Sequence, residues 1–587
     1  MYLFENPVLQ REMLVNLRMG RAFVLLLFYQ ALLAVLVYFA WPREGRLEAN
    51  PEAGRDLVNM LFLGQYVLSA LMTPSFAAAT ITGEKERKTY EMLLASPLKP
   101  AAICFGKMLA SLSHLMLLIV GSLPIAVLCL PLGGVDNTEI LAAFLGLLLS
   151  VITFGMISIA CSSYFSRTPA ALVASYLIIL PLALGAIWAW IGLEGDGQFR
   201  LTLTVTALPL ICAAITASLF ANTSARLLNP PDVGSEGKEV VDLEEEAKEA
   251  VGLVIQRDQF PDRLFAPPKS GELMPENSNP IYHKEIHSEI FSQGTLMLRL
   301  VIQISMVLAL PIMAICLFIW PQLANWYIGY VALFNVLVGP VFSAGSVTSE
   351  RERQTLDLLL TTTVTPWQIL WGKLIASLRI SSVLTLFLAW PLVLATVMVK
   401  DYWENLYAVL AYVGIILTTC LMTAIVGMFC SVIFRKTTMS LTTTYLVLLV
   451  LFVAPLAGSF FMQVFYPNSF RTIAVVTRQS EDLGAVSKTA DEASDEDLVN
   501  NEEPSWNLSM LGYLPTSPVE YLSVASPFAA ATSVPMNALN VDDEPRFVLY
   551  RQNWVFVLAY FFCSFCLIGI LMLLMIWLFN SRWRVSQ

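Results

Sequence analysis

Long apolar stretches recur along almost the whole chain, and this pattern constrains the fold more than any other feature of the sequence. Each stretch has about 20 residues, which is enough to cross roughly 30 Å of bilayer hydrocarbon as an α-helix. The stretches are continuous and do not alternate apolar with polar residues, so they predict helices and not the strands of a membrane barrel. We therefore predict an all-α polytopic membrane protein.

Composition supports this fold class, because 57% of the residues are hydrophobic and only 14% are charged. Soluble globular proteins carry roughly a quarter charged residues. The sequence predicts about twelve transmembrane helices, at residues 22–40, 57–81, 108–130, 140–165, 170–191, 202–222, 300–319, 327–348, 374–399, 406–433, 441–465 and 553–579.

The distribution of Lys and Arg predicts the orientation in the membrane. Cationic residues precede the first predicted span and follow the second, fourth, eighth, tenth and twelfth, whereas the loops 131–139 and 320–326 contain none. Positive charge marks the cytoplasmic side of membrane proteins. We expect both termini to be cytoplasmic and residues 466–552 to lie on the opposite side.

Two acidic segments interrupt the apolar pattern. Residues 230–280 hold 12 acidic and 5 basic residues, and residues 466–552 hold 13 acidic and 5 basic residues. We interpret both as solvated segments. The predicted domains are a first transmembrane half at 1–229, an acidic cytoplasmic linker at 230–277 and a second half at 278–587, which contains the extracytoplasmic segment 466–552. This outer segment is a candidate contact for an extracytoplasmic partner.

The two halves repeat one another. "NPVLQRE" at 6–12 corresponds to "NPIYHKE" at 279–285, and "CSSYFSRT" at 161–168 corresponds to "CSVIFRKT" at 430–437. Residues 81–112 align with 347–378 without a gap, with 14 of 32 positions identical. The sequence thus predicts two parallel six-helix repeats around an axis along the membrane normal. Each would begin with an amphipathic interfacial helix, and in the second of these Ile281, Ile286 and Ile290 are expected to face lipid.

The most polar part of the repeat is "TGEKERKTYEMLL" at 82–94 and "TSERERQTLDLLL" at 348–360, which we name the first and second charged segments. Each is predicted to form one cytoplasmic helix, in which Glu84 and Lys88 are four residues apart. The apolar residues Tyr90, Leu93 and Leu94 fall on one face, and Leu356, Leu359 and Leu360 repeat it. A solvated connector is one interpretation. A docking element whose apolar face enters a partner's groove explains the duplication better.

The first charged segment and its continuation, "ITGEKERKTYEMLLASPLKPAAICFGK", resemble the segment between the second and third spans of ABC-2 type permeases. The NP start of each half is similar to the start of those proteins. The resemblance implies two fused six-span halves, each with a coupling helix that docks an ATP-binding subunit, near 83–96 and 349–362. It implies docking roles for Glu84, Lys85, Glu86, Arg87, Thr89, Glu91, Leu93 and Leu94, and for Glu350, Arg351, Glu352, Arg353, Thr355, Asp357, Leu359 and Leu360.

The function implied by the resemblance is the permease subunit of an ABC transporter, most simply an exporter in a bacterial inner membrane. Two cytoplasmic ATP-binding subunits per chain would bind ATP and Mg²⁺, and we expect no cofactor in this chain. The "GK" pairs at 106–107 and 372–373 lack the rest of a phosphate-binding loop, so the chain is not expected to be an ATPase.

Other chemistry finds little support in the sequence. His283 and His287 do not form H-E-x-x-H and have no evident third ligand, so we expect no metal site. No catalytic constellation appears, no nucleic-acid partner is expected, and the substrate is not readable. A secondary carrier or channel stays an alternative, although the predicted spans contain no Asp or Glu. A scaffold that transmits force without transport is the other alternative.

Overall fold

The computed structural model describes residues 6–17, 51–86, 88–129, 135, 137–165, 168–192, 197–228, 279–287, 309–465 without 353 and 363, 523–534, 554–583 and parts of 27–38. These residues form helices and no strand, which confirms the all-α class for the described part of the chain. The helices are long where the sequence is apolar, because a helix satisfies its backbone hydrogen bonds internally in lipid.

The first half of the chain contributes the following elements: α1 (Pro7–Leu17), α3 (Pro51–Ala77), α4 (Ala79–Glu86), α5 (Tyr90–Leu94), α6 (Pro100–Val127), α7 (Asn137–Tyr164), α8 (Thr168–Gly192), α9 (Gly197–Thr202), a π-helical turn at Leu203–Ala207 and α10 (Leu208–Leu228). Proline at the first position of α6 starts that helix where a backbone N–H is not needed.

The second half contributes α12 (Pro280–His287), turns at Ala314–Ile319 and Pro321–Leu323, α15 (Ala324–Ser343), α16 (Thr348–Glu352), α17 (Leu356–Leu360), α18 (Pro366–Met398), α19 (Lys400–Glu404), α20 (Leu406–Ile433), α21 (Thr437–Leu448), a π-helical turn at Leu449–Val453, α22 (Ala454–Phe465), α25 (Pro527–Ser533) and α26 (Trp554–Trp583). Thr365 and Gln368 form a capping box at the start of α18.

Nine helices of the described residues are long and apolar enough to cross a membrane, or ten if a helix pair within α6 that bends by 41° is one span. These ten match ten of the twelve predicted spans. The predicted span 22–40 lies mostly outside the described residues. Of 300–319 only a shorter apolar helix, Ala309–Ile319, is described. The chain is a multi-pass integral membrane protein, and the count of twelve stays a prediction.

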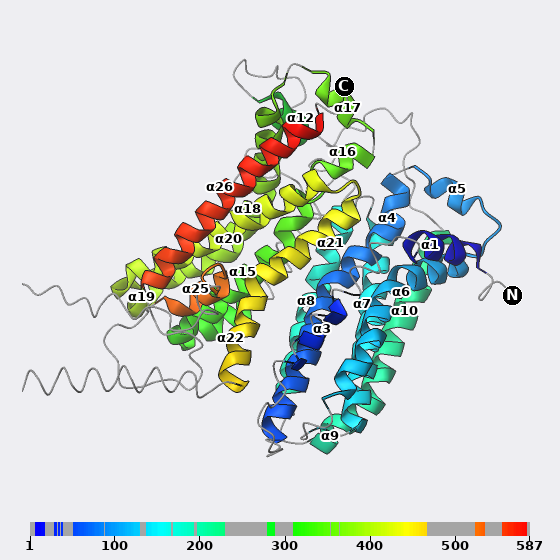
Figure 1. The fold of residues 1–587 in the computed structure, drawn as a ribbon, viewed down its shortest axis with the longest axis horizontal. Helices are drawn as coiled ribbons and strands as arrows, with labels where there is room; N and C mark the ends of the chain where they lie inside the picture. The colour runs from blue at the N-terminus through cyan, green and yellow to red at the C-terminus, as the bar shows by residue number, and fades with distance from the viewer. Residues whose placement is uncertain are drawn as a thin grey trace, which may run out of the picture.

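The two halves form adjacent helix bundles (Figure 1), with the blue and cyan helices of the first beside the green to red helices of the second. They meet where α3 and α8 pack against α15 and α21. At this seam the rings of Tyr176 and Tyr445 meet edge to face, with centroids 5.4 Å apart. The Tyr176 hydroxyl donates to the Leu71 carbonyl at 2.7 Å, and the Tyr445 hydroxyl donates to the Leu337 carbonyl at 2.6 Å. The seam therefore repeats one contact from both halves.

Candidate functional site

Both charged segments lie at the same end of the molecule, together with α1, α12 and the carboxyl end of α26 (Figure 1). The prediction of one continuous helix in each is wrong. The first segment is divided between α4 and α5, and the second between α16 and α17. The break occurs at Lys88, with φ of 58°, and at the equivalent residue Gln354, with φ of 57°.

Each break is a Schellman turn, which ends a helix with one residue in the left-handed conformation. In the first segment the Thr89 N–H donates to the Glu84 carbonyl at 3.0 Å, and the Lys88 N–H donates to the Lys85 carbonyl at 3.1 Å. The second segment repeats both bonds from Thr355 and Gln354, at 3.0 and 3.2 Å. Glycine usually occupies such a position, so neither sequence carried the usual signal for the break.

The left-handed conformation of Gln354 can be tested by substitution with glycine. Gln354→Gly is expected to raise the free energy of unfolding by about 0.5–1 kcal/mol, because relief of roughly 1–2 kcal/mol of strain exceeds the entropy that glycine adds to the unfolded chain. Leu358→Gly, an exposed position within α17, is the matched control and should lower it by about 1 kcal/mol. Unfolding by SDS in mixed micelles measures both, and destabilisation by Gln354→Gly would contradict the strain argument.

Four charged residues of the segments bind the ends of neighbouring spans. Lys85 donates from Nζ to the carbonyls of Ser163 at 2.8 Å and Phe165 at 2.9 Å, which caps the end of α7. The Glu86 carboxylate accepts from the Thr168 N–H at 2.8 Å, which caps the start of α8. Cations suit helix carboxyl ends and anions suit amino ends. Lys85 and Glu86 therefore bind both sides of the turn that connects α7 to α8, and we call this arrangement a clamp.

The second half repeats this clamp with one change of residue. Arg351 donates to the carbonyls of Phe434 at 2.8 Å and Val432 at 2.9 Å, at the end of α20. The Glu352 carboxylate accepts from the Thr437 N–H at 3.0 Å, at the start of α21. Arginine reaches two carbonyls with its planar fork, where lysine uses one ammonium.

Serine side chains join the same spans to the start of each segment. The Ser162 hydroxyl accepts from the backbone N–H groups of Ile81 at 3.2 Å and Thr82 at 2.9 Å. Ser431 accepts in the same way from Val347 at 2.9 Å and Thr348 at 3.0 Å. The repeats "CSSYFSRT" and "CSVIFRKT" thus supply groups that hold the charged segments, a role that the sequence analysis missed.

The carboxylates of Glu84 and Glu350 point into the protein. Each accepts a hydrogen bond from the threonine five residues later, Thr89 or Thr355. Lys107 lies 3.4 Å from Glu84 and 3.8 Å from Glu12. In the second half Lys373 lies 3.4 Å from Glu350 and 2.6 Å from Glu285. These lysines are those of the "GK" pairs, and they join the charged segment to the first helix of its half.

The second cluster is tighter than the first. Lys284 adds an ion pair of 2.6 Å to Glu350. Lys107 and Lys373 share one further kind of contact, because Lys107 donates to the Thr80 carbonyl and Lys373 to the Ser346 carbonyl, both at 2.9 Å. The side chain of Lys373 is only 1% exposed. Buried charges with several partners are costly to disturb, so we treat this cluster as the rigid base of α16.

The NP and GK repeats also meet in space. The Asn6 side chain caps α1 by accepting from the Val8 N–H at 3.0 Å, and it donates to the Ala102 carbonyl at 2.5 Å. Asn279 does the same for α12 and the Gln368 carbonyl, at 3.0 and 2.7 Å. The expectation that Ile281 faces lipid is wrong, because Ile281 is buried in a cluster with residues of α18. The side chains of Ile286 and Ile290 lie outside the described residues.

Glycine permits this close approach. A methyl group built on Gly106 would lie 2.8 Å from the Asn6 amide nitrogen, and one on Gly372 would lie 3.0 Å from the Ile281 Cβ. The first helix of each half therefore packs directly on the start of the third predicted span, beside the charged segment.

The apolar face of each segment packs inward, which corrects the prediction that it enters a partner's groove. Tyr90 is buried in a cluster with α6 and α7, and Leu94 packs on that cluster. Leu356 and Leu359 are buried against α18 and α20, and Leu360 packs there too. Leu93 is half-buried. The sequence located an apolar face but did not say whether the protein itself covers it.

The outward face instead carries two apolar residues that the sequence analysis did not single out, beside Glu91, which it did. Met92 is 77% exposed, and Leu358, its equivalent, is 69% exposed. Glu91 is exposed beside Met92. Arg87, Arg353 and the side chain of Asp357 lie outside the described residues. Each half therefore presents one exposed apolar side chain on a short helix, and the charge network holds the helix that comes directly before it.

Comparison with known families identifies the family of the chain. One family model, described as ABC-2 family transporter protein, matches residues 200–582, and a second with the same description matches residues 46–196. No curated protein and no solved structure matched the chain significantly. The two matches lie in tandem and together cover nearly all of the chain. Since one model alone spans more than half of the residues, the chain belongs to the ABC-2 family of transporter proteins.

Proposed function

We propose that this chain is the permease subunit of an ABC exporter in the inner membrane of a bacterium, with both termini and both charged segments in the cytoplasm. Separate ATP-binding subunits would hold ATP and Mg²⁺ and dock on α5 and α17. The observation that carries the proposal is the pair of exposed residues Met92 and Leu358, each on a short helix that directly follows a helix bound to two membrane spans. An exposed apolar anchor within a polar rim is a typical docking feature.

The contacts beneath these helices support a route for force. A push on α5 reaches α4, and Lys85 and Glu86 connect α4 to the ends of α7 and α8. α8 carries Tyr176, which meets Tyr445 of the other half at the seam. In the proposed mechanism ATP-driven closure of the partners moves both charged segments. The two bundles then rock as rigid bodies about this seam.

The charged residues implied as docking sites divide into two roles in this proposal. Glu91, Met92 and Leu358 contact the ATP-binding subunit. Glu84, Lys85 and Glu86, with Glu350, Arg351 and Glu352, transmit the motion because they bind the permease itself. Substitution of the second group would disturb folding as well as docking, so the first group gives the cleaner test.

The test is co-purification from native membranes with the double variant Met92→Asp/Leu358→Asp. Wild type should retain a polypeptide that 8-azido-ATP labels, and the double variant should lose most of it, because a desolvated charge opposes docking. Met398→Asp is the matched control, since Met398 is 67% exposed at the opposite end of α18.

The outcomes separate the proposal from its alternatives. Equal retention by the double variant would show that α5 and α17 are not the docking surface. No labelled polypeptide with wild type, combined with flux that follows an ion gradient, would favour a secondary carrier or channel. ATP-dependent docking without movement of any solute would favour a subunit that transmits force, with residues 466–552 as the outer contact.

A further inference from the structure

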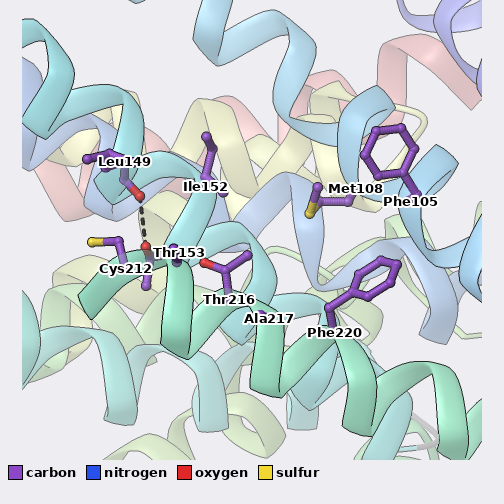
Figure 2. Close-up of a pocket in the computed structure, with 10 residues that line it drawn as sticks. Phe105, Met108, Leu149, Ile152, Thr153, Cys212, Thr216, Ala217 and Phe220 are labelled. Carbon is purple, nitrogen blue, oxygen red and sulfur yellow. Dashed lines mark hydrogen bonds between the residues drawn. The ribbon is translucent and has the colours of Figure 1, made fainter. Parts of the chain in front are cut away.

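The first half has a groove in its surface, and two of the groove's lining residues, Met108 and Phe220, also pack against the cluster that buries Tyr90. The groove lies between α6, α7 and α10 and has a volume of about 440 Å³. Figure 2 shows Phe105, Met108 and Phe220 at one end and Leu149 and Cys212 at the other. The groove belongs to the first half alone, because α10 packs on α6 and α7 and not at the seam between the halves.

The lining of the groove selects an apolar occupant. Nearly all of its surface is hydrocarbon or sulfur, and the Thr153 hydroxyl already donates to the Leu149 carbonyl at 2.8 Å. The Thr216 hydroxyl has no hydrogen-bond partner among the described residues. One free hydroxyl is too little to bind a polar solute. Small-molecule sites span roughly 300–1,000 Å³, so the groove fits one hydrocarbon chain and not a helix of about 10 Å diameter.

The groove opens toward the bilayer. Only 6% of the most apolar window of the span that contains α10 is buried within the protein, the lowest share among the spanning helices of the described residues. The other face of α10 is therefore covered by lipid. A lipid chain can enter from the side without crossing a polar surface.

A cation lies beyond the phenylalanine end of the groove. Arg226 on α10 is six residues past Phe220, which is about 9 Å along the helix. Its guanidinium stacks on the Tyr164 ring at 3.7 Å, and the Asn222 amide donates to the Tyr164 hydroxyl at 3.2 Å. Within the described part of the chain, Arg226 has no carboxylate partner, and its Nε is buried without a hydrogen bond. This end is the cytoplasmic end of α10 in the predicted orientation.

We propose that the groove binds one acyl chain of an anionic phospholipid from the cytoplasmic leaflet, with the lipid phosphate on Arg226. The 9 Å between Phe220 and Arg226 leaves room for the glycerol group. Arginine favours phosphate because its planar donors match the phosphate oxygens. Basic pockets between spans on the cytoplasmic side are a known way to bind lipid headgroups. The proposal does not depend on docking of ATP-binding subunits.

The test uses the full chain in micelles that contain equal amounts of phosphatidylglycerol and phosphatidylcholine, with retained lipid counted by native mass spectrometry. Wild type should retain one phosphatidylglycerol in preference to phosphatidylcholine. Ala217→Trp fills the groove and should abolish retention, whereas Ala214→Trp, on an exposed part of the same helix that does not line the groove, should not. Arg226→Gln should lower retention of phosphatidylglycerol about fivefold, and the exposed Arg435→Gln should leave it unchanged.

Three results would overturn the proposal. The first is equal retention in wild type and Ala217→Trp, which would identify the bound lipid as annular. The second is an unchanged preference for phosphatidylglycerol in Arg226→Gln, which would remove the phosphate contact. The third is a retained polypeptide in place of lipid, lost in Ala217→Trp. Arg226→Gln alters only the end of the groove, so it keeps the test decisive if Ala217→Trp does not fold.

Discussion

Lys373→Met is expected to lower the free energy of unfolding by about 3–5 kcal/mol, because it leaves two carboxylates without their buried cation. Lys373 lies 2.6 Å from Glu285 and 3.4 Å from Glu350, and these carboxylates are 18% and 12% exposed. Its Nζ also donates to the Ser346 carbonyl. The loss should appear in SDS unfolding of the full chain in mixed micelles.

Two variants make this result specific. Lys284→Met removes the other cation that pairs with Glu350, but Lys284 is half exposed, so we expect a loss of about 1 kcal/mol or less. The triple variant Lys373→Met/Glu285→Gln/Glu350→Gln removes all three charges and should recover most of the lost stability. If Lys373→Met cost no more than Lys284→Met, the cluster would not be the rigid base of α16.

The sequence predicted the class of fold well because membrane spans depend on length and hydrophobicity, which are readable residue by residue. Ten of the twelve predicted spans have counterparts among the described helices. The internal repeats also located residues that contact the charged segments. Asn6, Ser162 and Lys107 all belong to repeated stretches, and each contacts the first charged segment or its flanks.

The sequence did not predict whether these side chains contact the protein itself or a partner. A helical period assigned Tyr90, Leu93 and Leu94 to one face, but it cannot say whether the protein or a partner covers that face. The helix break at Lys88 could not be predicted because no glycine occupies that position. The residues after the break were therefore assigned to the same helix as those before it. Ion pairs such as Lys107 with Glu84 join residues 23 positions apart, which no local pattern encodes.

The same reasoning explains why the outward residues were missed. Met92 and Leu358 occupy equivalent places in the two charged segments, yet each differs from its counterpart in residue type. A search for identical positions favours Glu84 and Glu86, which recur unchanged in the second half and bind the permease itself. In the proposed function, this difference lets α5 and α17 select different faces of the ATP-binding subunits.

Gly372→Val is expected to lower the free energy of unfolding by about 1–3 kcal/mol, the usual range for overpacking. A Cβ at this position meets the Ile281 Cβ and the Tyr282 backbone nitrogen, both at 3.0 Å. Neither atom can rotate away, so α12 must move from α18. That movement separates Glu285 from Lys373 and breaks the bond from Asn279 to the Gln368 carbonyl.

Gly64→Val in α3 is the matched control, because a Cβ built there has no heavy atom within 4 Å. It should change stability by less than about 1 kcal/mol, since valine is no worse than glycine in a helix. Hydrogen exchange of α12 gives a second readout. If exchange of α12 is faster than in wild type for Gly372→Val and unchanged for Gly64→Val, then α12 helps to hold α16 in place. Equal exchange in both variants would mean that α12 packs there without holding the charged segment.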